Sequence, residues 1–134
     1  MPVRDFRDLA CWQLAYALKS EVFAFTATLP ASRDFKFCDQ IRDASASAPR
    51  NIAEGFGRFA ARDRSRDFER FLGYARASIV ETQNHLIDAR DRGYIDEVLF
   101  SRLFNLAAAA RQTTTRLIMS KQKRERHGRR EPNA

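Results

Sequence analysis

Glu81 and His85 are the two residues of this chain whose types and spacing could most readily bind a metal ion. Residues four apart share one face of a helix. A dinuclear metal site in a helical bundle needs a Glu-x-x-His motif on each of two helices, with further glutamates. The chain has only two histidines, His85 and His127. We therefore expect no metal site and interpret Glu81 and His85 as a solvated pair on a helix.

Catalytic motifs are equally weak. Gly55-Phe56-Gly57 lacks the Lys-Ser/Thr that follows the glycines of a phosphate-binding P-loop. Serines, histidines and aspartates occur, but no pattern places a nucleophile beside a base. We predict that the protein is not an enzyme, has no catalytic residue and needs no cofactor.

Arginines gather on both sides of a predicted turn near residue 63. Arginine binds phosphate through paired hydrogen bonds and stacks on unpaired bases. Neighbouring acids offset the charge only in part, and a solvated face with i,i+4 ion pairs is the alternative. The candidate nucleic-acid-binding residues here are Arg58, Arg62, Arg64, Arg66 and Arg70.

Four aromatic residues are interleaved with these arginines: Phe59, Phe68, Phe71 and Tyr74. Aromatic rings are surfaces on which nucleic-acid bases stack. Their helical spacing also suits packing in a core, and we favour the core.

The C-terminal segment 121–134 holds six basic residues against two acidic ones and almost no apolar side chain. Such a composition predicts a disordered basic tail. The tail adds these candidate phosphate contacts: Lys121, Lys123, Arg124, Arg126, Arg129 and Arg130.

The amino-acid composition limits the possible fold class, the possible partners and the expected cellular compartment. The 134 residues suit one domain, and 44% hydrophobic residues with few glycines and prolines favour an all-α protein. A net charge of +7 makes RNA or DNA a plausible partner, although basic charge also serves solubility. Two cysteines give no disulfide framework, and no membrane span or signal sequence is visible. We expect a cytoplasmic protein with no membrane partner.

Helical periodicity predicts four helices, at about residues 8–29, 38–59, 65–92 and 96–122. Asp8 and Asp96 are expected N-caps, Pro30 should end the first helix, and Gly93 should end the third. Short links predict an up-down-up-down antiparallel four-helix bundle. The expected organisation is an N-terminal arm, the bundle and the basic tail, over residues 1–7, 8–120 and 121–134.

The second predicted helix carries Pro49 and a run of small residues from Ala44 to Ala48. An internal proline costs a helix about 3 kcal/mol, because it removes a backbone hydrogen bond and clashes with the preceding turn. The small residues predict close approach by another helix, and Gly55 and Gly57 predict the helix end. A kinked core helix without chemistry is the alternative to a functional role.

Polar residues flank the apolar face of this helix and of the next one. Buried charges without partners are costly, so we expect them to be paired. We predict a structural polar network that fixes helix register or a subunit contact, made of Gln40, Asn51, Glu54, Glu81 and Gln83.

The last predicted helix carries a heptad seam, formed by Leu99, Leu103, Leu106, Ala110, Thr113 and Leu117. Phe100 and Phe104 add apolar surface beside the seam. A bundle core needs only about a third of the helix circumference. The excess predicts either burial against another subunit or a wide core-facing stripe.

Three groups of residues resemble one family. They are Phe6-Arg7-Asp8-Leu9 with Trp12-Gln13; the stretch from Gln40 to Gly55 around Pro49-Arg50-Asn51-Ile52-Ala53-Glu54-Gly55; and Phe71-Leu72, Glu81-Thr82-Gln83 and Gly93-Tyr94-Ile95. On these residues the chain resembles the 23S rRNA-intervening sequence proteins, also called four-helix-bundle proteins, over about residues 4 to 120. Ala48 departs from the larger aliphatic residue that many relatives carry.

The resemblance implies a four-helix bundle that assembles as a ring-like homopentamer, with no catalytic residue. A similar fold serves as the accessory protein of diversity-generating retroelements, which binds nucleic acid and a reverse transcriptase. We therefore expect a non-enzymatic homo-oligomer that binds RNA or DNA electrostatically and with weak sequence specificity. The alternative is a protein–protein interaction scaffold or an accessory subunit with a protein partner.

Overall fold

The computed structural model describes residues 3–62 and 65–130. This part of the chain forms two short 3-10 helices and four α-helices and holds no strand. The elements are η1 (Phe6–Asp8), α1 (Ala10–Thr26), η2 (Ala31–Arg33), α2 (Phe35–Arg62), α3 (Ser65–Asp91) and α4 (Glu97–Arg130). The predicted all-α class and the four helices are confirmed.

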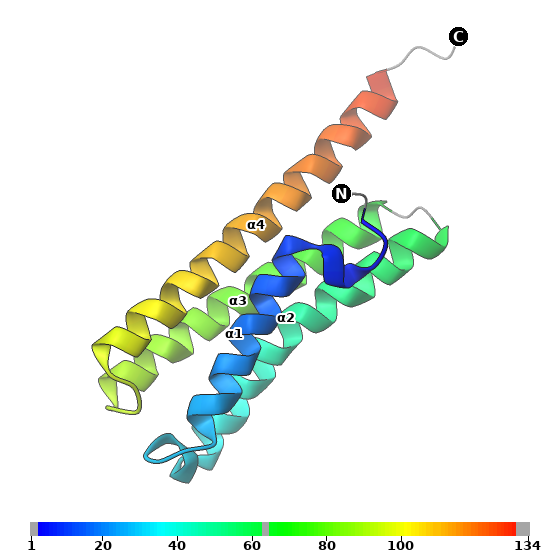
Figure 1. Cartoon of the computed structure of the whole chain (residues 1–134). Coiled ribbons are helices and arrows are strands. Elements are labelled where there is room, and N and C mark those ends of the chain that lie inside the picture. The colour runs from blue at the N-terminus through cyan, green and yellow to red at the C-terminus, as the bar shows by residue number, and fades with distance from the viewer. Residues whose placement is uncertain (1–2, 63–64, 131–134) are drawn as a thin grey trace.

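Consecutive helices run in opposite directions and pack side by side (Figure 1). α2 lies against α1 and α3, and α4 lies against α3 and α1, so the four helices close around a common core. This arrangement is that of an antiparallel four-helix bundle. The α2–α3 connection and the C-terminal half of α4 lie at the same end.

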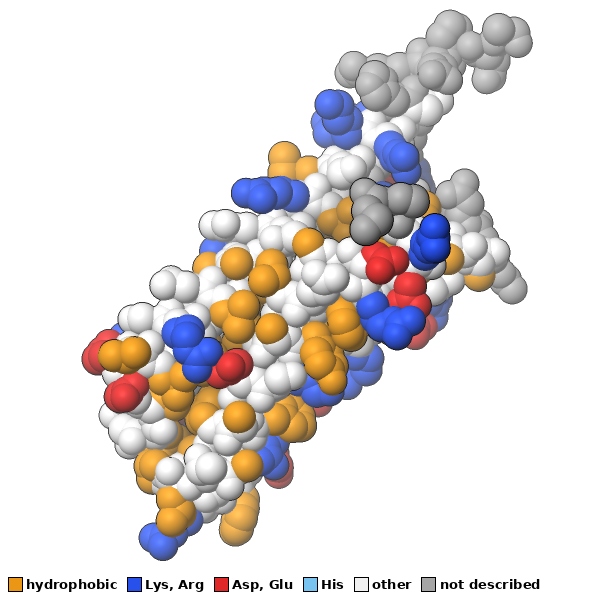
Figure 2. Space-filling model, in the orientation of Figure 1, with side chains coloured by type: hydrophobic (Ala, Val, Ile, Leu, Met, Phe, Trp, Pro, Cys, Tyr) orange, Lys and Arg blue, Asp and Glu red, His pale blue; other side chains and the backbone are white. Residues whose placement is uncertain are grey.

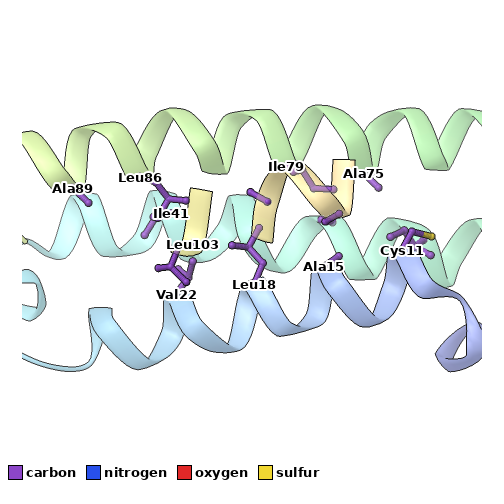
Figure 3. Close-up of a cluster of buried hydrophobic side chains, with 14 of the residues drawn as sticks. Cys11, Ala15, Leu18, Val22, Ile41, Ala75, Ile79, Leu86, Ala89 and Leu103 are labelled. Carbon is purple, nitrogen blue, oxygen red and sulfur yellow. The ribbon is translucent and has the colours of Figure 1, made fainter. Parts of the chain in front are cut away.

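The core is built from one apolar stripe on each helix. Leu18 and Val22 of α1 meet Ile41 of α2, Ile79 of α3 and Leu103 of α4, and each of these side chains is fully buried (Figure 3). Burying an aliphatic side chain of this size stabilises the fold by about 1.5–3 kcal/mol. The core therefore supplies the main force that holds the helices together.

The N-terminal arm is folded where the structure describes it. Asp5 caps η1, and the Asp8 carboxylate accepts hydrogen bonds from the backbone N–H groups of Arg4 and Asp5, at 2.9 and 3.1 Å. Leu9 precedes α1 without a side-chain cap. The prediction that Asp8 caps the first long helix is therefore wrong, because its carboxylate reaches back to the arm instead.

α2 continues through Pro49 to Arg62, so the prediction that Gly55 and Gly57 end this helix is wrong. Gly55 is buried where α2 meets α3. A Cβ at Gly55 would lie 2.8 Å from the Cβ of Phe71, closer than two such atoms can approach. The glycine is thus required by a close helix contact rather than by a helix end, as the small residues of this segment suggest.

α3 ends and α4 begins as the sequence predicts. Gly93 adopts a positive φ of 77° just after α3, a conformation that glycine accepts without strain. The Asp96 carboxylate accepts a hydrogen bond from the Leu99 backbone N–H at 2.8 Å, which caps α4.

α4 extends to Arg130, so the prediction of disorder from residue 121 is wrong for residues 121–130. Residues 131–134 lie outside the described part. Ile118 and Lys121 are both buried, and the Lys121 ammonium lies 4.0 Å from the centre of the Phe59 ring. Contact with the bundle therefore persists past residue 120, and the Lys and Arg residues that follow are good helix formers. We call residues 122–130 the α4 extension.

The apolar seam of α4 is rotated from its predicted position. The residues that face the core are Leu103, Ala107, Ala110, Thr114 and Ile118. The predicted seam residues Leu99, Leu106 and Leu117 are only half-buried and lie on one flank, while Phe100 and Phe104 are half-buried on the other. Apolar surface thus remains on both sides of the core-facing stripe.

Candidate nucleic-acid interface

The two groups of predicted cationic residues meet at one end of the bundle. The Lys121 ammonium of α4 lies over the rings of Phe59 on α2 and Phe68 on α3, at 4.0 and 5.3 Å from the ring centres. This contact places the start of the α4 extension beside the α2–α3 connection (Figure 1). In Figure 2, Lys and Arg side chains follow α4 past the bundle.

The arginines near the α2–α3 connection are partly neutralised. Arg58 donates to the Glu54 carboxylate at 3.1 Å and approaches Asp67 at 4.0 Å. Arg70 pairs with Asp67 at 3.4 Å, and Arg66 is exposed. The arginines therefore attract phosphate less strongly than a count of charges suggests. The side chains of the predicted contacts Arg62 and Arg64 lie outside the described residues.

The cations of the α4 extension are more available. Lys123, Arg124 and Arg126 are exposed, and none of them forms an ion pair with a carboxylate in the described ranges. Lys121 differs, because it is only 8% exposed and packs against aromatic rings. The structure thus gives Lys121 a packing role in place of the predicted phosphate contact. The side chains of Arg129 and Arg130 are not described.

A pair of carboxyl groups joins the α4 extension to α3. Burial raises the pKa of Glu69, and the negative charge of Glu125 and a hydrogen bond between the two side chains raise it further. Beyond that mutual bond, no described group donates to the buried Oε1 atom of either residue. The contact between the α4 extension and α3 is therefore least unfavourable when Glu69 is protonated.

The four aromatic residues divide between the core and the surface. Phe68 is 1% exposed and belongs to the core, and Phe59 is half-buried beneath Lys121. Phe71 is half-buried, with the guanidinium groups of Arg58 and Arg70 over its ring at 4.8 and 5.3 Å. Tyr74 is 49% exposed and meets the Phe71 ring edge-on, with ring centres 5.6 Å apart. Core packing therefore explains Phe68, but it does not explain Tyr74.

A chain of hydrogen bonds crosses from α2 to the turn of α3 that carries Tyr74. The Asn51 side-chain amide donates to the Ser47 backbone carbonyl and hydroxyl at 2.8 and 2.9 Å. The Ser47 and Ser78 hydroxyls lie 2.9 Å apart, and Ser78 also donates to the Tyr74 carbonyl at 3.0 Å. Ser47 and Ser78 were not among the residues of the predicted polar network. Two small hydroxyl residues on facing helices are nevertheless a sequence signal for such a contact.

The five residues of the predicted polar network do not come together. Glu54 pairs with Arg58 on its own helix, and Glu81 lies 3.6 Å from His85 on α3. Gln83 is buried, and Gln40 is exposed on the rim of a pocket at the other end of the bundle. Of the five, only Asn51 is linked by described hydrogen bonds to the α2–α3 contact, through Ser47 on its own helix. Sequence spacing places residues on a helix face but does not set how two helices are aligned.

The pocket beside Gln40 has a volume of about 230 Å³, and its lining residues Asp34, Asp88 and Arg92 pair with one another. The Tyr94 hydroxyl donates to Asp34 at 2.6 Å, and Arg92 donates to Asp34 and Asp88 at 2.9 and 3.0 Å. The hydrogen bond from Tyr94 is the main cause that lowers the pKa of Asp34. These contacts tie the α1–α2 loop to the end of α3, so we assign them a structural role.

The remaining chemically reactive side chains of the described residues do not form a metal site or an activated nucleophile. In the described ranges, no three His, Cys, Asp or Glu residues lie where they could share a metal ion. Cys11 and Cys38 are buried free thiols, and burial raises the pKa of Cys11 to about 11. A thiol with that pKa is a poor nucleophile at neutral pH. Within residues 3–62 and 65–130, no helix contains an apolar stretch long enough to cross a bilayer.

Comparison with models of protein families gives a match. A family model described as 23S rRNA-intervening sequence protein matches residues 7–116. The match spans α1 to α3 and most of α4, and it ends before the α4 extension. No curated protein matches the chain.

Proposed function

Since the chain belongs to the 23S rRNA-intervening sequence protein family, we propose that it is a non-enzymatic, oligomeric four-helix-bundle protein that binds nucleic acid. The observation that carries this proposal is the gathering of cations from α2, α3 and the α4 extension at one end of the bundle. Lysine and arginine bind phosphates with release of counterions, which favours association with any nucleic acid. Family membership alone does not name a nucleic acid, so the proposal rests on this surface.

We propose weak sequence specificity for the same site. Direct reading of base pairs needs side chains that enter a groove from a helix or strand of defined geometry. The exposed cations Lys123, Arg124 and Arg126 lie on the α4 extension, where they can contact phosphates without entering a groove. The sequence resemblance also implies a fold like that of the accessory protein of diversity-generating retroelements, and we propose a role of the same kind, in which the bundle binds nucleic acid together with a protein partner.

A ring-like homopentamer is the assembly we propose, as the family resemblance implies. The apolar flanks of α4 support it, because Leu106 and Phe104 lie on opposite sides of the core-facing stripe and are only half-buried in a single chain. A ring would repeat the cationic end once per subunit. Repetition converts weak phosphate contacts into useful avidity.

Fluorescence anisotropy with labelled RNA and DNA tests the proposal. Replacing Lys123 and Arg124 with alanine should weaken binding at low salt, because two phosphate contacts are lost. The matched control replaces Arg33 and Lys36, two exposed cations at the opposite end, and should leave affinity unchanged. If the intact protein binds neither nucleic acid at low salt, the basic charge serves solubility. The protein-scaffold function then becomes the better account, and exposed apolar residues such as Phe35 and Val98, at 78% and 79%, are where its partner would be sought.

A further inference from the structure

Tyr74, Phe71, Arg58 and Arg70 form a layered surface on α2 and α3, which we call the Tyr74 platform. The Arg58 and Arg70 guanidinium groups lie over the Phe71 ring at 4.8 and 5.3 Å, and the exposed Tyr74 ring stands against its edge. We propose that this platform stacks unpaired bases, so that the protein prefers single-stranded to double-stranded nucleic acid. The inference rests on the proposed nucleic-acid binding and names the form of nucleic acid that is bound.

Neutralised charge is the first argument. Glu54 and Asp67 pair with the platform arginines, so these arginines attract phosphate only weakly. Their side chains nevertheless stay 44% and 52% exposed. Guanidinium planes and aromatic rings are the two side-chain surfaces on which proteins stack splayed bases. The platform thus offers planar surfaces more than net charge.

The second argument is that the platform is held in place. The ion pairs to Glu54 and Asp67 fix the two guanidinium groups against the Phe71 ring. The Ser78 hydroxyl bonds to the Tyr74 carbonyl and to Ser47 of α2, which ties the backbone at Tyr74 to the neighbouring helix. A surface ordered before binding loses less conformational entropy when a ligand arrives.

The third argument concerns the ligand. Bases in a duplex are already stacked on one another, so a side chain on a convex helix surface reaches them only where the strands are unpaired. Every base has a flat π face, so stacking tolerates any sequence. Single-stranded RNA and DNA share this chemistry.

Anisotropy of the full-length protein tests the inference with labelled oligonucleotides of equal length: oligo-uridine, oligo-thymidine and a mixed-sequence duplex. Tyr74→Ala should weaken binding to the single strands by about tenfold, the effect expected for one stacked base. Tyr74→Phe should restore the affinity, and duplex binding should change little. The matched control is Tyr16→Ala, which removes an equally exposed tyrosine from α1. The ratio between oligo-uridine and oligo-thymidine shows whether RNA or DNA is preferred.

Photocrosslinking gives a second readout that does not depend on a variant. A strand containing 5-bromouracil should crosslink to the peptide that carries Phe71 and Tyr74. Equal affinity for single strands and duplex, with no effect of Tyr74→Ala, would overturn the stacking site and leave the proposed function standing. Crosslinking confined to the α4 extension would overturn it in the same way. Absence of binding to every oligonucleotide would overturn both proposals.

Discussion

At the residue scale, a hydrogen bond between two serine hydroxyls joins the middle of α2 to α3, in addition to the Arg58–Asp67 ion pair nearer the connection. Asn51 donates both amide hydrogens to Ser47, which in turn meets Ser78 of α3. A half-buried donor that loses its acceptors costs more than the bond itself contributes. The charged residues expected in this contact pair along their own helices instead.

Replacing Asn51 with alanine should lower the free energy of unfolding by about 1 kcal/mol, because it removes the donors to the Ser47 carbonyl and hydroxyl. Asn84→Ala is the matched control, since Asn84 is exposed on α3. That change should be neutral or slightly stabilising, because alanine is the better helix former. Urea unfolding of both variants provides the measurement. Equal stability of the two variants would show that the Asn51 bonds contribute nothing.

The Glu69–Glu125 pair makes stability depend on pH. Folding raises the pKa of Glu69 above its ordinary value of 4.5. The stabilising effect of protonated Glu69 is therefore complete below that value and is lost as the pH rises through the raised pKa of Glu69. Glu69→Gln should raise the melting temperature at pH 7 by about 2 °C, an effect of the size expected for one partly exposed charge.

Thermal unfolding at pH 5 and pH 7 checks this effect. The stabilisation by Glu69→Gln should be smaller at pH 5, where Glu69 is closer to its protonated form. Glu97→Gln serves as the control, because Glu97 is highly exposed and should not gain stability when neutralised. A Glu69→Gln variant less stable than the parent at pH 7 would contradict the account.

At the scale of the helices, two glycines of α2 have opposite roles. Gly55 faces α3 at a distance that leaves no space for a side chain, whereas a Cβ at Gly57 would have no atom within 4 Å. Gly55→Ala should destabilise the protein by about 1–2 kcal/mol, because the overlap with Phe71 outweighs the gain in helix propensity. Gly57→Ala should stabilise it by up to about 1 kcal/mol. Chemical denaturation distinguishes the two, and stabilisation by both changes would show that α2 and α3 do not pack this closely.

The number, order and approximate extents of the helices could be predicted, because periodicity, Gly93 and Asp96 are local signals. The helix ends that were predicted wrongly, those of α2 and α4, depend on contacts between helices. Gly55 looks like a terminator until Phe71 is placed beside it, and the α4 extension begins where Lys121 meets rings from two other helices. The exposure of Tyr74 could have been inferred, since it falls outside the stripe of Phe68, Leu72, Ala75 and Ile79. The Ser47–Ser78 contact could not, because it needs the alignment of two helices.

For the whole molecule, the half-buried apolar flanks of α4 are the surface on which an assembly would form. We expect a homo-oligomer, with five subunits as the proposed number, and light scattering at micromolar concentration measures it directly. Leu106→Glu should reduce the oligomer mass, because it places a charge on an apolar flank. Ser101→Glu, at an exposed polar position of the same helix, should leave it unchanged. A parent protein that is monomeric at this concentration would exclude the assembly.

Truncation after Gln122 is the measurement that tests nucleic-acid binding by the cationic end most directly. It keeps Lys121 with its aromatic contacts and removes residues 123–134, so the melting temperature and oligomer mass should change little. Affinity for a labelled single strand should fall. The slope of log affinity against log salt should become shallower by about 2, since the loss of the three exposed cations Lys123, Arg124 and Arg126 removes three contacts and each contact on a single strand contributes about 0.7. A truncated protein with the parent's affinity and salt slope, or a parent that binds no nucleic acid at low salt, would contradict the account.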